Sequence, residues 1–125
     1  MKKFIGVLLM CSASLALNSA YGHGAPSPSH GGIVQAVGET WLELVVKGGT
    51  VELYVEDDGE PMDSAGLSGQ LTIVNGAGKT EFALKPAGGN KLEAKGALAA
   101  KGAKVIALLV LADKKTKVPA TFLIK

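Results

Sequence analysis

Two histidines are the side chains in this chain with the clearest potential for chemistry, and both lie near its amino terminus. His23 and His30 fall within one short stretch, Gly22 to Gly32, which is rich in glycine and proline. Imidazole nitrogen is a good ligand for copper, nickel and zinc. Two histidines so close together predict a transition-metal site, unless they are simply exposed residues of a tail.

The residues before this stretch have the layout of a secretory signal peptide. Lys2 and Lys3 precede an apolar run that begins at Phe4 and ends in small residues. We predict a signal peptide over residues 1–22, with cleavage after Gly22 or, alternatively, after Ala20. The apolar run is interrupted by serines and is shorter than the roughly 20 residues of a membrane span. The sequence therefore predicts an exported, periplasmic protein without stable membrane insertion.

Signal cleavage would itself create metal ligands. Cleavage after Gly22 leaves His23 first, so that its α-amine and ring nitrogen chelate one ion and His30 adds a third nitrogen. Cleavage after Ala20 leaves Tyr21-Gly22-His23, whose amine, amides and imidazole suit square-planar Cu(II) or Ni(II). Met62 is a weaker candidate because its thioether suits Cu(I), although a lone methionine more often fills a core. Copper is the favoured metal, with nickel, silver and zinc left open.

Composition limits the other possibilities. Cys11 is the only cysteine and falls within the predicted signal peptide, so the mature chain would have neither disulfides nor a thiolate metal site. The charge is uneven: acids dominate between Glu39 and Asp63, whereas ten lysines and only three acids lie between Lys79 and Lys125. The chain contains no arginine and few aromatic residues, which argues against a nucleic-acid partner.

The hydrophobic pattern predicts an all-β protein. A flexible arm is expected over residues 23–32 because of its prolines, and a single domain over residues 33–125. Alternating apolar residues and glycine-rich turns predict strands over 33–37, 41–47, 51–56, 70–74, 80–85, 91–95, 104–112 and 118–125. These seven to eight short strands are typical of an immunoglobulin-like antiparallel β-sandwich, with a small β-barrel as the alternative.

Individual strands carry further expectations. The clearest is a hairpin whose strands join at Gly48-Gly49, with Leu42 and Leu44 facing the core. Residues 104–112 are apolar on both faces, which predicts a central strand that is covered on both sides. Trp41 and Tyr54 are expected on the outer face, as an exposed patch or as a cross-strand pair.

Catalysis has little support in the sequence. No histidine accompanies a serine nucleophile in a recognisable order, and the carboxylates occupy outward strand positions or turns, where their pKa values are not expected to be strongly tuned. We therefore expect no enzymatic activity.

Several segments resemble small periplasmic proteins of Gram-negative bacteria that are associated with heavy-metal efflux and resistance genes. Those sequences open with Pro-His-Gly-Gly and continue with a Glu-Leu-Val strand, a Leu-Tyr-Val-x-Asp strand and a Pro-Ala-Gly-x-Asn-x-Leu turn. The matching segments here are His30-Gly31-Gly32, Glu43-Leu44-Val45, Leu53-Tyr54-Val55-Glu56-Asp57 and Pro86-Ala87-Gly88-Gly89-Asn90-Lys91-Leu92. Ser29 stands where the family pattern has proline.

The resemblance implies a periplasmic protein connected with copper, silver or zinc, and a metal-efflux component as partner. Together with the histidines it predicts a non-enzymatic protein that binds or delivers a metal, most simply copper. His30-Gly31-Gly32 has an alternative interpretation as a turn, capped by the imidazole, that leads into a strand. The alternative function is a metal-free interaction module that engages another envelope protein through its acidic hairpin face or an unpaired sheet edge.

Overall fold

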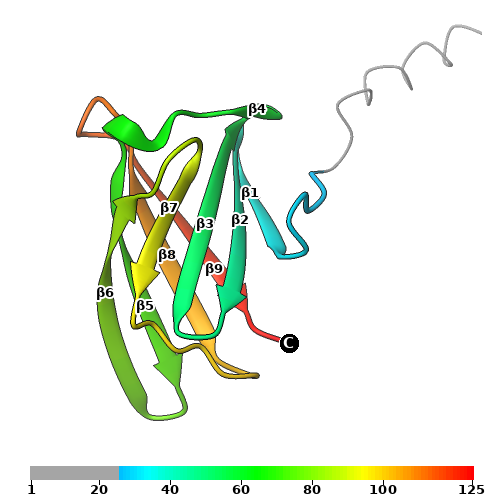
Figure 1. Cartoon of the computed structure of the whole chain (residues 1–125), viewed down its shortest axis with the longest axis vertical. Helices are drawn as coiled ribbons and strands as arrows, with labels where there is room; N and C mark the ends of the chain where they lie inside the picture. Colours follow the sequence, from blue (N-terminus) through cyan, green and yellow to red (C-terminus); the bar gives the residue numbers. More distant parts are fainter. Residues whose placement is uncertain (1–25) are drawn as a thin grey trace, which may run out of the picture.

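The computed structural model describes residues 26–125, so the predicted signal peptide over 1–22 and His23 lie outside the described residues. Nine strands follow one another along the described chain: β1 (Ile33–Val37), β2 (Thr40–Lys47), β3 (Thr50–Asp57), β4 (Glu60–Pro61), β5 (Ser68–Asn75), β6 (Gly78–Pro86), β7 (Lys91–Lys95), β8 (Lys104–Val110) and β9 (Lys117–Leu123). One 3-10 turn, η3 (Ser64–Gly66), joins β4 to β5 (Figure 1).

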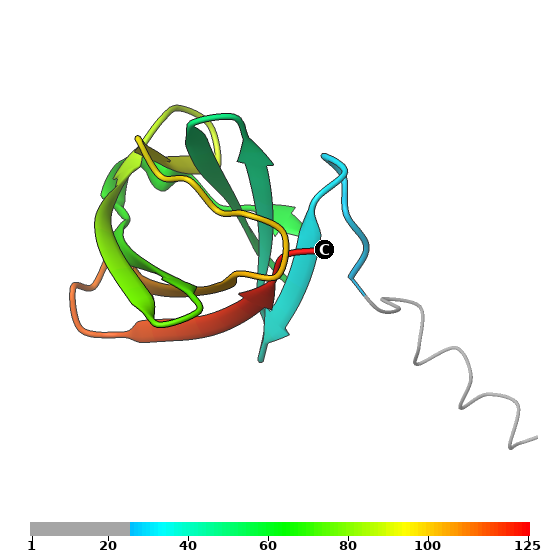
Figure 2. The same ribbon diagram turned by 90° about the horizontal axis from the view of Figure 1, so that it is seen from below.

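The strands form one antiparallel path in the order β1-β2-β3-β7-β6-β5-β8-β9, and β4 pairs with β3 outside it. The terminal strands β1 and β9 lie side by side, so the sheet curls into a nearly closed barrel (Figures 1 and 2). This confirms the predicted all-β antiparallel fold. Near-closure protects both edge strands, because β1 and β9 shield each other.

Hairpins fix the register of the barrel. Gly48 has a positive φ of 54° at the turn between β2 and β3, where Lys47 pairs with Thr50. A two-residue turn of this kind needs positive φ, which glycine adopts at little cost. The turn expected between the strands predicted over 70–74 and 80–85 is also present, since Asn75 pairs with Gly78 between β5 and β6. Residues 91–95 form strand β7, as predicted.

The core fills the inside of the barrel with side chains from alternating strand positions. The largest fully buried side chains include Phe122, Leu42, Leu44, Leu53, Leu71, Ile73, Leu84, Leu92 and Leu109. Burying each of these contributes about 1.5–3 kcal/mol relative to leaving it exposed. Because side chains in a strand alternate between faces, the residues between them point outward.

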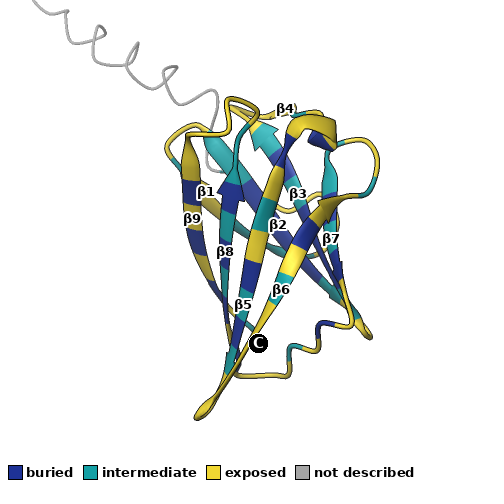
Figure 3. Cartoon of the chain, turned by 90° about the vertical axis from the view of Figure 1, so that its left-hand side faces the viewer, coloured by how far each residue is buried: buried dark blue, intermediate teal, exposed yellow. Residues whose placement is uncertain are grey.

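One expectation about strand coverage is wrong. Residues 104–112 were expected to form a strand covered on both faces, but β8 ends at Val110 and only one of its faces is buried. Val105, Ala107 and Leu109 face the core, while the outward Ile106 and Leu108 remain partly exposed (Figure 3). The reason is that no segment of the described chain lies over the outside of β8.

The N-terminal segment differs from its prediction as well. Residues 23–32 were expected to be a flexible arm, yet residues 29–32 are held against the outside of β2 by hydrogen bonds to the side chain of Glu43. Prolines exclude regular structure here but do not prevent docking. Along residues 26–125, none of the helical structure is long and apolar enough to span a membrane.

Candidate functional site

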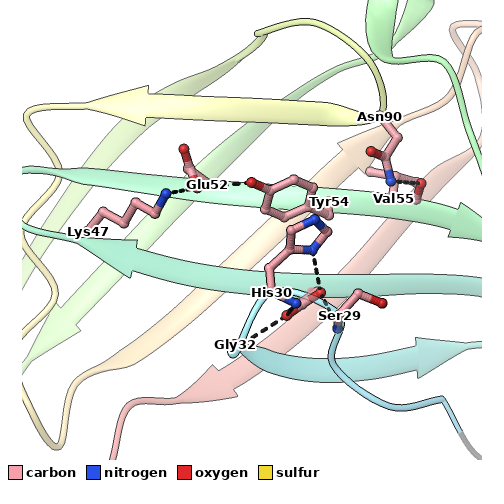
Figure 4. A network of polar contacts seen from close by, with 9 residues as sticks. Ser29, His30, Gly32, Lys47, Glu52, Tyr54, Val55 and Asn90 are labelled. Carbon is pink, nitrogen blue, oxygen red and sulfur yellow. Dashed lines mark hydrogen bonds and ion pairs between the residues drawn. The ribbon is translucent and has the colours of Figure 1, made fainter.

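One buried carboxylate organises the site. Glu43 points outward from the middle of β2 but is only 7% exposed, because residues 29–32 cover it. Its Oε1 accepts a hydrogen bond from the Ser29 main-chain nitrogen at 3.1 Å, and its Oε2 accepts from the main-chain nitrogens of His30 at 2.8 Å and Gly32 at 2.9 Å (Figure 4). A single side chain thus anchors the N-terminal segment to the barrel.

The local sequence explains how the segment turns so tightly around this carboxylate. Gly31 has a φ of 75°, a conformation that side-chain-bearing residues rarely adopt. Gly32 is required for a different reason: a Cβ there would lie 2.2 Å from the Leu44 carbonyl oxygen and 2.9 Å from Val45 Cγ2. The two glycines of the His-Gly-Gly motif therefore serve backbone conformation and close approach, respectively.

The hydrogen bonds also control the charge of Glu43. Burial alone would raise the pKa of this carboxyl, but the hydrogen bonds from His30, Gly32 and Ser29 together outweigh burial and hold the pKa below its ordinary value of 4.5. Glu43 is therefore ionised at neutral pH. Glu43 faces outward, as the alternation of β2 predicts, but the N-terminal segment removes it from solvent.

The imidazole of His30 is fixed at two points. Its Nδ1 lies 3.0 Å from Glu43 Oε1, and its ring stacks on Tyr54 with centroids 3.6 Å apart and planes tilted by 7° (Figure 4). Tyr54 of β3 pairs with Glu43 of β2, so both partners come from neighbouring strands. The His30 side chain nevertheless remains 39% exposed. It is oriented without being enclosed.

A second buried carboxylate supports Tyr54. The Tyr54 hydroxyl donates to Glu52 Oε1 at 3.2 Å, and Lys91 Nζ donates to Glu52 Oε2 at 3.2 Å. Lys47 Nζ lies 3.6 Å from Glu52 Oε1. Burial opposes ionisation of Glu52, but the bonds and charges of Lys91 and Lys47 outweigh it and lower its pKa below 4.5. Burial and the neighbouring Glu52 raise the pKa of the Tyr54 hydroxyl above 10.0.

These contacts form one continuous network from the N-terminal segment across three strands. It runs from His30 through Tyr54 and Glu52 to Lys91, with Glu43 holding its first member. Charge-assisted hydrogen bonds of this kind are about twice as strong as neutral ones. The network therefore stiffens the outer face of the β2–β3 hairpin and binds two of its acidic side chains, Glu43 and Glu52, within the chain.

The candidate ligands are not gathered by the described structure. His30 lies on the outer face of the barrel, whereas Met62 packs against the core, so the structure does not bring these two together. His23 lies outside the described residues. Within residues 26–125, no cluster of three or more His, Cys, Asp or Glu side chains is arranged to hold a metal ion.

The outer aromatic residues do not form a direct cross-strand pair. Trp41 pairs with Glu56 in the β2–β3 register, while Tyr54 pairs with Glu43. Both aromatic side chains instead line a pocket of about 10 Å³, together with Pro26 and Ser27 of the N-terminal segment. This is room for about one water molecule.

The sequence alone did not identify Glu43 and Tyr54 as partners of His30, or Glu52 as a partner of Tyr54. A pattern that identifies one pair was present: a two-residue turn at Gly48-Gly49 places Glu43 opposite Tyr54. What the register does not reveal is that residues 29–32 fold back over this pair.

Comparison of the chain with protein-family models, with curated proteins and with solved structures finds no match.

Proposed function

We propose that this chain is a non-enzymatic periplasmic protein that binds or delivers a transition metal, with copper favoured, through His30 and His23. The observation that supports this most directly is the 3.0 Å contact between His30 Nδ1 and the Glu43 carboxylate. Since Glu43 is ionised, its carboxylate can only accept at this contact, so Nδ1 is the ring nitrogen that donates its N–H. The lone pair is then on Nε2, which is the nitrogen available to a metal.

The arrangement matches the supporting contacts of known metal sites. A metal-bound histidine usually donates its other ring N–H to a carboxylate, which fixes the tautomer and ring orientation and raises the basicity of the ligand nitrogen. Stacking on Tyr54 at 3.6 Å further limits rotation of the ring. The ring is thus prepared for a ligand while remaining accessible, with 39% of its side chain exposed.

The remaining nitrogen ligands come from the processed terminus. His23 precedes Pro26 by three residues, and Pro26 lines the same small pocket as Glu43 and Tyr54. Three residues span at most about 10 Å when extended. After signal cleavage at Gly22, this reach would allow both the α-amine and the His23 ring to approach His30. Nickel, silver and zinc are alternatives, although structural zinc normally takes four protein ligands.

A metal-efflux component is the natural partner of such a protein, by the resemblance of the sequence to proteins that accompany efflux genes. The metal-free alternative, an envelope interaction module, is not favoured at the part of the acidic hairpin face that carries Glu43 and Glu52. Glu43 and Glu52 on that face are buried and bonded within the chain. A partner would have to displace those contacts.

The test uses exported protein whose amino terminus has been verified by mass spectrometry. We expect Cu(II) titration to give an electron paramagnetic resonance spectrum with several nitrogen ligands. His30→Phe is the sharpest variant because phenylalanine retains the stack on Tyr54 but has no ligand nitrogen. It should weaken Cu(II) binding by at least about tenfold, a loss of about 1.4 kcal/mol.

Two further samples separate binding at this site from unspecific binding. His23→Ala should also weaken binding and change the spectrum, whereas Met62→Leu should leave Cu(II) binding unchanged. Thermal unfolding of metal-free His30→Phe shows whether the fold is intact. Equal Cu(II) affinity in wild type and in a His23→Ala, His30→Phe double variant would refute the proposal. Parallel titrations with Zn(II), Ni(II) and Ag(I) identify the preferred metal.

A further inference from the structure

The boundary between β6 and β7 is the least complete in the barrel path. These strands pair only at Lys85↔Glu93 and Pro86↔Leu92, whereas β5 and β6 pair along almost their whole length. Beyond Lys85↔Glu93 the two strands diverge (Figure 3). A cleft of about 460 Å³ opens there, lined by Phe82, Ala83, Lys85, Pro86, Glu93 and Lys95. This is within the usual range for binding sites, about 300–1,000 Å³.

The backbone on each side of the cleft faces into it. In β7, the Gly96 nitrogen donates toward β3, to the Gly49 carbonyl oxygen, so the alternate residues Glu93 and Lys95 direct their main-chain groups toward β6. Continuation of the ladder would place Ala83 opposite Lys95. Among the described residues that pairing is absent, so two lengths of strand edge remain open. Open edges are templates for an added strand.

The side chains around the cleft differ between its two faces. Lys85 and Lys95 are exposed on the outer rim, and the only acid among the lining residues, Glu93, lies 3.7 Å from Lys95. Phe82 lies on the inner side, partly buried against the core. A segment entering here therefore meets positive charge outside and apolar surface inside. An extended strand in which acidic and apolar residues alternate would direct its acidic side chains outward and its apolar side chains inward.

We propose that this cleft accepts an extended segment of another protein, with alternating apolar and acidic residues, as an additional strand between β6 and β7. Its backbone pairs with the open edges, its acidic side chains lie beside Lys85 and Lys95, and its apolar side chains face Phe82. This is recognition by strand addition. None of the cleft residues takes part in the His30 network, so the proposal stands independently of metal binding.

The probe is an acetylated and amidated Val-Glu-Val-Glu-Val peptide, titrated into ¹⁵N-labelled protein without metal and followed by NMR. We expect chemical-shift changes to concentrate at the amides of Ala83 and Lys95. A Val-Lys-Val-Lys-Val peptide should bind at least about tenfold more weakly because its charges repel the rim. The acidic peptide with alternate N-methylated amides should not bind, because it cannot complete the ladder.

Charge-reversed variants provide the matched comparison. Lys85→Glu together with Lys95→Glu should abolish the preference for the acidic peptide. Lys114→Glu together with Lys115→Glu, in the exposed turn after β8, makes the same charge change away from the cleft and should leave that preference intact. Shifts that centre on another surface, binding that survives N-methylation, or concentration-dependent shifts without peptide would each overturn the proposal.

Discussion

The outer faces of β2 and β8 differ in a way that the polarity of their residues does not predict. Beside the aromatic Trp41, the outer face of β2 carries Glu43 and Val45, and these two are only 7% and 8% exposed. The outer face of β8 carries Ile106, Leu108 and Val110, and all three remain partly exposed. The middle of β2, which has a charged outer residue, is covered on both sides, while the more apolar β8 is covered on one.

A segment without secondary structure therefore needs hydrogen-bond partners before it can cover a sheet. Residues 29–32 bring main-chain N–H groups, which are costly to bury unpaired. The carboxylate of Glu43 accepts three of them as well as the His30 ring. The outer side chains of β8 have no acceptors to offer. Val45 is therefore buried because the charged side chain of Glu43, on the same face of β2, holds the covering segment in place.

The largest expected effect comes from blocking the docking of this segment. Gly32→Val places a Cβ where only 2.2 Å separates it from the Leu44 carbonyl oxygen. The segment must then leave the sheet and lose its bonds to Glu43, which we expect to lower the free energy of unfolding by about 2–4 kcal/mol. Urea unfolding measures this loss. Fluorescence of Trp41, the only tryptophan, should report the exposed pocket.

Gly31→Ala is the matched control. Its Cβ meets nothing within 4 Å, so only the positive φ of 75° is strained. That strain costs about 1–2 kcal/mol. If Gly32→Val destabilises no more than Gly31→Ala, close packing of the segment on β2 is not what covers that face.

The strand pattern could be predicted from the sequence because alternation and glycine turns are local. The pairing Lys47↔Thr50 follows from the turn at Gly48-Gly49 alone. Burial of a strand's outer face, by contrast, depends on segments from elsewhere in the chain. The apolar outer positions of β8 indicated a strand buried on both sides, but burial also requires a covering segment, and the segment before β1 lies over β2 instead.

The candidate site was predictable only in part for the same reason. His30 stood out by its residue type, and the hairpin register already placed Glu43 opposite Tyr54. The contact between His30 and this pair depends on how residues 29–32 fold back over β2. The prolines before these residues predicted a flexible arm instead. Whether His23 joins His30 depends on signal cleavage and remains a prediction.

A smaller effect is expected from removing the charge of Glu43 without changing its size. Glu43→Gln replaces one acceptor oxygen by an NH₂ group that faces donors, which should cost about 1–3 kcal/mol. The cost should depend on pH. The folded-state pKa of Glu43 is below 4.5, so the unfolded chain takes up the proton first as the pH falls. The stabilisation is present above about pH 4.5 and is lost as the pH falls through the folded pKa.

The measurement is urea unfolding of wild type and Glu43→Gln between pH 7 and pH 2.5, with a chelator present. The difference between the two proteins should be largest at neutral pH and narrow in acid. Other carboxyls with lowered pKa values, such as Glu52, affect both proteins alike and cancel in the difference. A difference that stays constant with pH would mean that Glu43 acts by shape and not by charge.

The smallest effects come from one substitution placed on each of the two faces. Valine and threonine have almost the same shape, so the exchange tests desolvation of a hydroxyl. Val45→Thr, under the N-terminal segment, should cost about 1–2 kcal/mol because the hydroxyl loses water. Val110→Thr, on the open face of β8, should change stability by less than about 0.5 kcal/mol. Thermal unfolding of both variants measures the contrast, and a cost at Val110 equal to that at Val45 would show that the outer face of β8 is covered in solution.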